Sequence, residues 1–119
     1  MLKIYAYSKC STCRKALEWL DKHDIAHETH DIVTAPPSRK ELEALFKRSG
    51  FPIARFFNTS GESYRAGDFK TKLKTMTEAQ ALDALAKDGK LIKRPLVDAG
   101  KTVLVGFDEA SFKQMEAGI

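Results

Sequence analysis

The sequence predicts one α/β domain, and three observations along the chain support this fold class. Strand, helix and strand patterns follow one another in the first third. Helical segments opened by capping boxes occupy the middle, and two short apolar runs and a helix end the chain. A length of 119 residues suits one hydrophobic core better than two. We therefore expect the order β-α-β, a helical insert, then β-β-α.

The first third is predicted to form a βαβ unit. The run from Leu2 to Tyr7 alternates apolar and polar residues loosely and is rich in aromatic and β-branched types, as strands are. A helical pattern starts at Ser11 and fades near His23, with an apolar stripe of Ala16, Leu17, Trp19 and Leu20. The run from Ile25 to Val33 alternates again, and a helix between two strands favours a parallel pair.

The middle of the chain opens with a helix start signal. Pro36 and Pro37 interrupt the chain, and Ser38 is then placed to cap a helix, with Glu41 able to reach back to the cap residue. Gly50 is the expected end of this helix. The predicted buried stripe consists of Leu42, Leu45 and Phe46.

Three further segments complete the middle. Pro52 permits a short helical turn that carries Ile53, Phe56 and Phe57. The polar, glycine-bearing stretch from Asn58 to Phe69 is predicted to be a loop. Thr77 and Gln80 form another capping box, which opens a helix that we expect to stop at Gly89.

The last third is predicted to contain a β-hairpin and a helix. Two strand-like runs, Leu91 to Asp98 and Lys101 to Phe107, are joined by a short turn that contains glycine. Pro95 would disturb a central strand, so it belongs at an edge or at a strand start. Asp108 is placed to cap the final helix.

Composition narrows the class of protein. A hydrophobic fraction of 43% and a charged fraction of 30% exclude a disordered chain. The net charge of +4 is spread among acidic residues, which favours solvated helix faces over a nucleic-acid footprint. No apolar run approaches the roughly 18–20 residues that span a bilayer, and no signal-peptide pattern opens the chain. We expect a cytoplasmic protein, where thiols are kept reduced, with no membrane partner.

The only two cysteines, Cys10 and Cys13, lie where the strand pattern gives way to the helix pattern. A zinc finger would need His23 and His27 as ligands, but the gap from Cys13 to His23 is too short and the predicted elements are misplaced. Inert core cysteines are expected within an apolar run, whereas polar residues surround this pair. The pattern therefore favours a redox pair, and we expect no metal.

The position of the pair suits redox chemistry. The thiolate is the reactive form of cysteine, and the partial positive charge at a helix N-terminus makes a thiol more acidic. Cys10 is expected at such an N-terminus, with Lys9 and Arg14 adding positive potential. Cys13 lies one turn along, where it can close a disulfide with Cys10 and resolve a mixed intermediate.

Four stretches of the chain resemble a known family: YSKCSTCRKALEWLDKHDI, APPSRKELEALFKRSG, LIKRPLV and VGF. From Leu2 to about Phe112 the chain resembles the arsenate reductase (ArsC)/Spx family of thioredoxin-like proteins. The resemblance implies a glutaredoxin-type, four-stranded mixed sheet with helices on both faces. It also implies a single domain over residues 1–119, with a core at about 1–35 and 91–119 and an all-helical insert at about 36–90. Pro95 is implied to be a cis-proline beside the cysteines.

Resemblance to the glutaredoxin-linked arsenate reductases implies that Cys10 is the nucleophile and that Arg94 binds an oxyanion. The chain departs from their pattern, which has serine, histidine and two arginines where this sequence has Cys13, Ala6, Asn58 and the stretch Gly106 to Asp108. An arsenate held by one arginine instead of three loses contacts of about 1.5–3 kcal/mol each. Arsenate reduction is therefore disfavoured, although Arg65 can substitute for a missing arginine.

The Spx branch of the family shares the CxxC motif followed by Arg-Lys-Ala, and it shares Trp19. In that branch the disulfide is a sensor that tunes binding to the α-subunit of RNA polymerase, without direct DNA binding. The loop FFNTSGESYR is more similar to that of uncharacterised ArsC/Spx-like paralogues than to that of Spx itself. The resemblance leaves a thiol reductase and a redox-responsive regulator open.

Several other side chains are candidates for the site. The guanidinium of Arg94 would lower the pKa of a nearby cysteine thiol. It would also orient an anionic substrate, such as one that bears the carboxylates of glutathione. Arg14 can stabilise either thiolate, and Tyr64 and Arg65 lie in a loop that can fold over the site. The stretch from Asn58 to Ser60 is interpreted as turn-forming. Trp19 is expected in the core, and the histidines at the surface.

Together these observations favour a cytoplasmic thiol–disulfide oxidoreductase that acts on a small thiol or a protein disulfide. We expect no cofactor, with glutathione as the candidate reductant. The alternatives are a redox-sensing regulator that binds the RNA polymerase α-subunit, and an arsenate reductase. The predicted catalytic residues are Cys10, Cys13 and Arg94, and the predicted substrate-binding or anion-binding residues are Arg14, Arg65 and Pro95.

Overall fold

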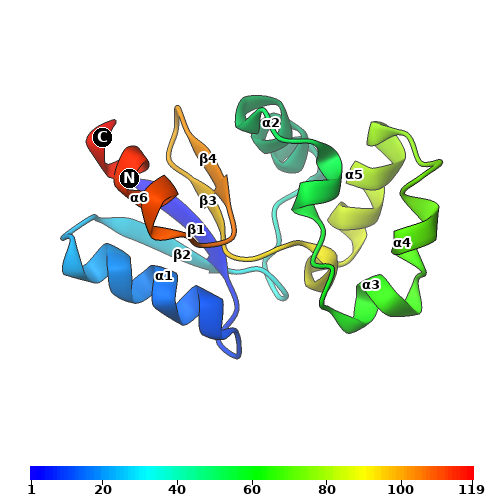
Figure 1. Ribbon diagram of the computed structural model, residues 1–119, viewed down its shortest axis with the longest axis horizontal. Coiled ribbons are helices and arrows are strands. Elements are labelled where there is room, and N and C mark those ends of the chain that lie inside the picture. The colour runs from blue at the N-terminus through cyan, green and yellow to red at the C-terminus, as the bar shows by residue number, and fades with distance from the viewer.

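A computed structural model describes residues 1–119 and contains one four-stranded mixed sheet (Figure 1). The strands lie in the order β2-β1-β3-β4. β2 is parallel to β1, whereas β3 is antiparallel to both β1 and β4. The predicted α/β fold class and the mixed sheet are confirmed. The strands are β1 (Leu2–Ala6), β2 (His27–Asp31), β3 (Leu96–Asp98) and β4 (Val103–Val105).

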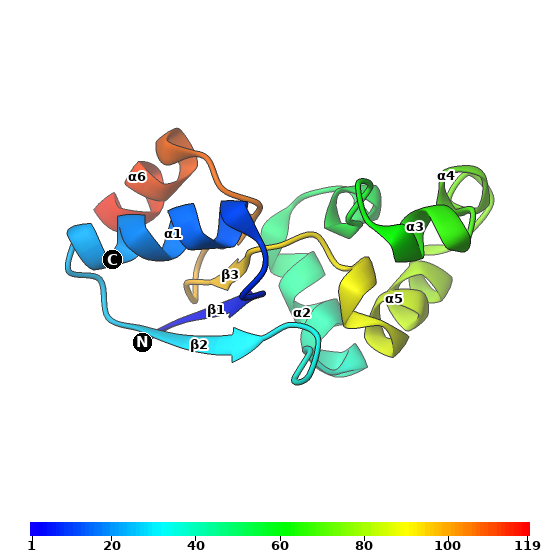
Figure 2. The same ribbon diagram turned by 90° about the horizontal axis from the view of Figure 1, so that it is seen from below.

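The helices form two groups, and Figures 1 and 2 show the sheet with α1 and α6 at one end of the molecule and the other helices at the opposite end. The α-helices are α1 (Ser11–Lys22), α2 (Arg39–Ser49), α3 (Glu62–Ala66), α4 (Phe69–Lys72), α5 (Glu78–Lys87) and α6 (Glu109–Ala117). Two 3-10 helices are η1 (Ile53–Phe56) and η2 (Gly89–Leu91). None of these helices combines the length and the apolar character needed to cross a membrane. The division into a core and an insert stays a prediction.

One face of the sheet is covered by α1 and α6, which lie on the same side in Figure 2. Trp19 of α1 packs edge to face against Phe112 of α6, with ring centroids 5.4 Å apart. Both side chains belong to a buried cluster with Ile4, Val97 and Leu104 of the sheet. Because residues along a strand alternate between faces, Tyr5, Leu96, Val103 and Val105 join the opposite cluster, with the helices between α2 and η2.

The helix caps agree with the sequence. Ser38 with Glu41, and Thr77 with Gln80, each form a complete capping box, and Gly50 ends α2 in the left-handed conformation. The Asp108 carboxylate accepts a hydrogen bond from the Ser111 N–H at 2.8 Å and caps α6. These local signals are strong because each side chain satisfies a backbone group that the helix leaves unpaired.

The prediction of a loop from Asn58 to Phe69 is wrong, because α3 lies within this stretch and α4 begins at its last residue. The physical reason is aromatic packing. Tyr64 and Phe69 lie against Phe57, with ring centroids at 6.4 and 5.6 Å. Polar and glycine residues along the stretch predicted a loop, but burial of these rings orders it as short helices.

The strand predicted from Leu91 to Asp98 is shorter than expected. Leu91 ends η2, and the strand begins only at Leu96, after the cis peptide bond between Arg94 and Pro95. The intervening residues instead pair with the segment after η1. Phe57 and Ile92 form an isolated antiparallel bridge, flanked by two backbone hydrogen bonds of 2.8 Å, from Asn58 N–H to the Leu91 carbonyl and from Lys93 N–H to the Phe56 carbonyl.

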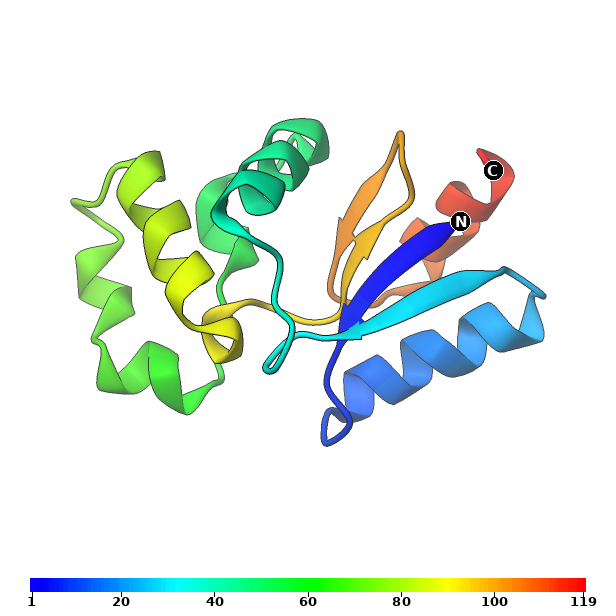
Figure 3. The ribbon, with the colours of Figure 1, turned by 180° about the vertical axis from the view of Figure 1, so that it is seen from behind.

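The two ends of the molecule are joined by the segment after β2 and the segment before β3, which run close together in Figure 3. Gly89 lies directly against the backbone of Ile32 and Val33 at this junction. Arg48 of α2 adds a bidentate ion pair to Asp98 of β3, with nitrogen to oxygen distances of 2.9 and 3.1 Å. The helices are therefore held against the sheet by both packing and charge.

Replacing Gly89 with alanine is expected to destabilise the protein. An added Cβ would overlap the Ile32 carbonyl oxygen, so the two segments must separate. We expect Gly89→Ala to lower the free energy of unfolding by about 1–3 kcal/mol in urea titrations followed by circular dichroism. Gly118→Ala is the control, because its Cβ would meet nothing closer than 3.6 Å. Equal midpoints for the two variants would contradict the close approach.

Candidate active site

Cys10 lies in the turn that leads from β1 into α1. Its backbone N–H donates to the Tyr7 carbonyl at 3.1 Å, and its carbonyl accepts the Arg14 N–H at 3.1 Å, which is the first hydrogen bond of the helix. The backbone of Cys10 is extended (φ −107°, ψ 114°), as at a helix N-cap. The predicted position of Cys10 at the helix N-terminus is confirmed.

The Cys10 sulfur itself caps the helix. It accepts a hydrogen bond from the Cys13 backbone N–H, with a nitrogen to sulfur distance of 3.3 Å. Partial burial raises the pKa of the Cys10 thiol, but interactions with the Cys13 side chain, the Cys13 N–H and Arg94 outweigh burial and leave that pKa below its ordinary value. The geometry therefore favours the thiolate, the nucleophilic form.

Cys13 has the opposite environment. Its side chain is fully buried in the cluster beneath α1, where the sequence had suggested polar surroundings. Burial, followed by its interaction with Cys10, raises the pKa of the Cys13 thiol to about 12. Both cysteines are free thiols in this structure. The pair thus combines an accessible acidic thiol with a buried thiol that stays protonated.

Arg94 approaches Cys10 from the segment that precedes β3. Its interaction with the sulfur and its positive charge both lower the pKa of the Cys10 thiol. The guanidinium carbon lies 4.8 Å from the ring centroid of Tyr7, in a cation–π contact. Arg94 is thereby held beside the sulfur, and its peptide bond to the buried Pro95 is cis, as the family resemblance implied.

Cys10 opens into a surface cavity of about 460 Å³. Three cationic side chains and one carboxylate line it, so the cavity favours an anionic occupant. The bridge between Phe57 and Ile92 places the chain around η1 beside the chain around Arg94 and so brings these groups together. The lining residues are Cys10, Thr12, Arg55, Asn58, Thr59, Ser60, Lys93, Arg94, Val105, Gly106, Phe107 and Asp108.

None of the three predicted binding residues lines this cavity. Arg14 is exposed on α1 and does not line it. Arg65 borders a separate hollow of about 280 Å³ with Tyr64, and its guanidinium donates to the Ser60 carbonyl at 2.9 Å. Pro95 lies beneath the surface next to Arg94, and its carbonyl accepts the Gly106 N–H at 2.9 Å.

Sequence reasoning missed several lining residues. Arg55 was not singled out, although the structure places it in the cavity wall, 4.1 Å from the Phe51 ring centroid. Lys93, next to Arg94, also lines the cavity, as do Asn58 to Ser60, for which the sequence predicts only a turn. The one sequence signal was the cationic pair before Pro95. The contribution of η1 depends on pairing between distant segments, which no local pattern reports.

The histidines take part in other contacts. His23 stacks on Trp19 with ring centroids 3.8 Å apart, and its Nδ1 lies 3.0 Å from a Glu116 oxygen. His27 Nδ1 lies 2.8 Å from the Ile25 carbonyl oxygen. No group of three or more His, Cys, Asp or Glu side chains is arranged to hold a metal ion.

Comparison with known proteins agrees with this geometry. The model of the ArsC family matches residues 5–115, which include both cysteines and Arg94. The chain belongs to the ArsC family. Among its ArsC-family relatives is the Bacillus subtilis protein YusI, 48% identical over 113 residues, which cover 95% of this chain and 96% of YusI.

This ArsC-family chain is also similar to a transcriptional regulator and to a protein of known structure. The global transcriptional regulator Spx of Streptococcus pyogenes is 28% identical over 109 residues, which cover 92% of this chain and 80% of Spx. The crystal structure of an ArsC family related protein from Bacteroides fragilis superposes with a TM-score of 0.94 at 41% identity, covering 96% of each chain. The predicted family and fold are confirmed.

The two arginines near the cysteines provide a matched test of the site in this ArsC-family chain. We expect Arg94→Met to raise the pKa of Cys10, because the positive charge and the side-chain interaction that lower it are lost. Arg14→Met should leave that pKa unchanged, since Arg14 lies outside the cavity. The measurement is the rate of iodoacetamide alkylation against pH, with the modified cysteine identified by mass spectrometry. Equal midpoints for both variants would contradict the assignment of Arg94.

Proposed function

We propose that this protein is a thiol–disulfide oxidoreductase in which Cys10 is the nucleophile and Cys13 the resolving thiol. The observation that carries the proposal is the Cys10 sulfur, which caps α1, contacts the Cys13 N–H at 3.3 Å and opens into a positive cavity. An acidic thiol that faces solvent, with a second thiol one helical turn away, suits attack on a disulfide followed by resolution.

The different environments of Cys10 and Cys13 give the two thiols different roles in the reaction. The Cys10 thiolate attacks one sulfur of a substrate disulfide; a Cys10 mixed disulfide forms, the substrate S–S bond breaks, and the leaving thiolate takes up a proton. Cys13 then loses its proton to the departing second thiolate and attacks the Cys10 sulfur, which closes the Cys10–Cys13 disulfide. The substrate gains two electrons and the pair loses two. Two equivalents of a thiol such as glutathione, oxidised to its own disulfide, would restore the pair.

The buried thiol sets the order of these steps. Because the pKa of Cys13 is raised to about 12, Cys13 does not compete with Cys10 for the first attack at neutral pH. It becomes a nucleophile only beside the mixed disulfide, where the departing thiolate can accept its proton. Arg94 helps to lower the pKa of the Cys10 thiol and provides a contact for an anionic substrate. We place this activity in the cytoplasm, where reducing thiols are available.

Cysteine replacements test the assigned roles. We expect Cys10→Ser to reduce a small disulfide no faster than the uncatalysed background, because the nucleophile is gone. Cys13→Ser should accumulate a stable mixed disulfide at Cys10, which mass spectrometry detects as an added substrate thiol. Disulfide reduction by Cys10→Ser at the parental rate would overturn the proposal. Arsenate offered in place of the disulfide tests the arsenate reductase alternative in the same assay.

A redox-responsive regulator is the second candidate, and the similarity to Spx over 109 residues favours it. In this case the Cys10–Cys13 disulfide would act as a switch for binding to the RNA polymerase α-subunit. The test is capture of purified α-subunit by the oxidised and the reduced protein. Binding in only one redox state would support the regulator hypothesis, and absence of binding in both states would contradict it.

A further inference from the structure

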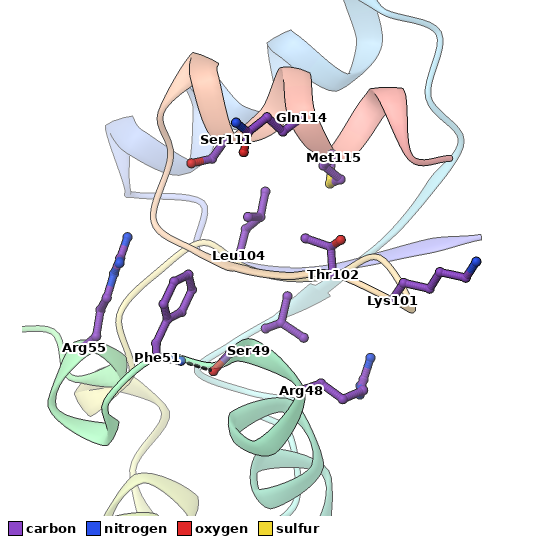
Figure 4. Close-up of a pocket in the computed structure, with 11 residues that line it drawn as sticks. Arg48, Ser49, Phe51, Arg55, Lys101, Thr102, Leu104, Ser111, Gln114 and Met115 are labelled. Atoms are coloured by element: carbon purple, nitrogen blue, oxygen red, sulfur yellow. Dashed lines mark hydrogen bonds between the residues drawn. The ribbon is translucent and has the colours of Figure 1, made fainter.

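Another hollow, of about 480 Å³, follows the outer edge of the sheet at β4 (Figure 4). One wall comes from α6, through Ser111, Gln114 and Met115. The opposite wall comes from the end of α2, from Phe51 and from Arg55 of η1. The residues from Lys101 to Leu104 lie between the walls, as Figure 4 shows, so the edge of β4 forms the floor of a groove.

The floor presents backbone groups for pairing, because β4 has only β3 as a neighbour. Ala99 N–H donates to the Thr102 carbonyl and Gly106 N–H to the Pro95 carbonyl, each at 2.9 Å. Since an antiparallel ladder alternates, residues 102, 104 and 106 turn their backbone groups toward β3. Val103 and Val105 therefore direct their N–H and carbonyl groups to the outer edge.

The positive charges that line the groove favour an acidic occupant. Lys101 and Arg55 lie at opposite ends in Figure 4, and neither forms an ion pair, whereas Arg48 is paired with Asp98. No carboxylate lines the groove. A second copy of the chain docked edge to edge would bring these cations toward one another, which disfavours a homodimer. An extended segment with acidic side chains complements both the open edge and the charge.

The groove leads to the reactive cysteine. Arg55 lines both this groove and the cavity at Cys10. The same strand contributes to both, because Lys101 to Leu104 line the groove and Val105 to Asp108 line the cavity. A chain that pairs with Val103 and Val105 therefore runs along the groove and arrives beside Cys10.

We propose that the substrate is a protein disulfide on an acidic, extended segment, which adds to the outer edge of β4 as a fifth strand and presents its sulfur to Cys10. This inference rests on the proposed oxidoreductase function for the chemical step, whose electron balance is the one given above. Backbone pairing supplies affinity, and Lys101 and Arg55 supply preference for acidic sequences.

Amide hydrogen exchange tests binding separately from chemistry. The probe is a short cysteine-free peptide that alternates glutamate with valine, added to the reduced full-length protein. We expect the amides of Val103 and Val105 to gain protection, while that of Leu104, already directed toward β3, stays unchanged. A peptide with lysine in place of glutamate should give no protection. Absence of protection with the acidic peptide would overturn the proposal, even if Cys10 and Cys13 reduce disulfides.

A kinetic comparison then connects the groove to the cysteines. We expect Lys101→Glu to lower kcat/KM at least fivefold for an acidic peptide disulfide, and to leave the rate with a small neutral disulfide unchanged. Lys113→Glu is the matched control, because Lys113 is exposed on α6 but outside the groove. Equal effects of both variants would contradict the groove. Peptide protection without reduction of either disulfide would support peptide binding in the groove and contradict the oxidoreductase function.

Discussion

The hydrogen bond from the Cys13 N–H to the Cys10 sulfur is the interaction on which the site depends. A helix leaves its first N–H groups unpaired, and here the acceptor is a thiol instead of the usual hydroxyl or carboxylate. The same contact orients the sulfur, favours its thiolate and fixes its distance from the second cysteine. Because Cys13 is buried under α1 by the packing of that helix on the sheet, the reactivity of Cys10 is coupled to the core.

The positive cavity is a product of long-range pairing. η1 and the segment before β3 are separated by more than thirty residues, yet the bridge between Phe57 and Ile92 sets them side by side. Arg55 and Lys93 reach the cavity only through this pairing, and Arg94 is oriented by its contact with Tyr7. The helices between α2 and η2 therefore contribute to the site as well as to the core.

Membership of the ArsC family leaves the activity open, because one fold can carry different chemistry at the same cysteine. This chain has a second cysteine where the arsenate reductases it resembles usually have serine. Arg94 matches one of the three arginines that the resemblance implies, but the other two cations of the cavity, Arg55 and Lys93, come from other positions. Those differences, together with the open edge of β4, direct our proposal toward protein disulfides.

Local signals in the sequence were enough to determine the order of the strands and of the longer helices, the helix caps and the place of Cys10 at the start of α1. Each of these depends on neighbouring residues, as in the pairs Ser38 with Glu41 and Thr77 with Gln80. Tertiary structure alone decided the rest. Aromatic packing around Phe57 turned a predicted loop into helices, burial of Cys13 separated the two thiols, and the distant segments around Arg55 and Arg94 met in one cavity. Such contacts join residues far apart in the chain, so no periodicity or spacing reports them.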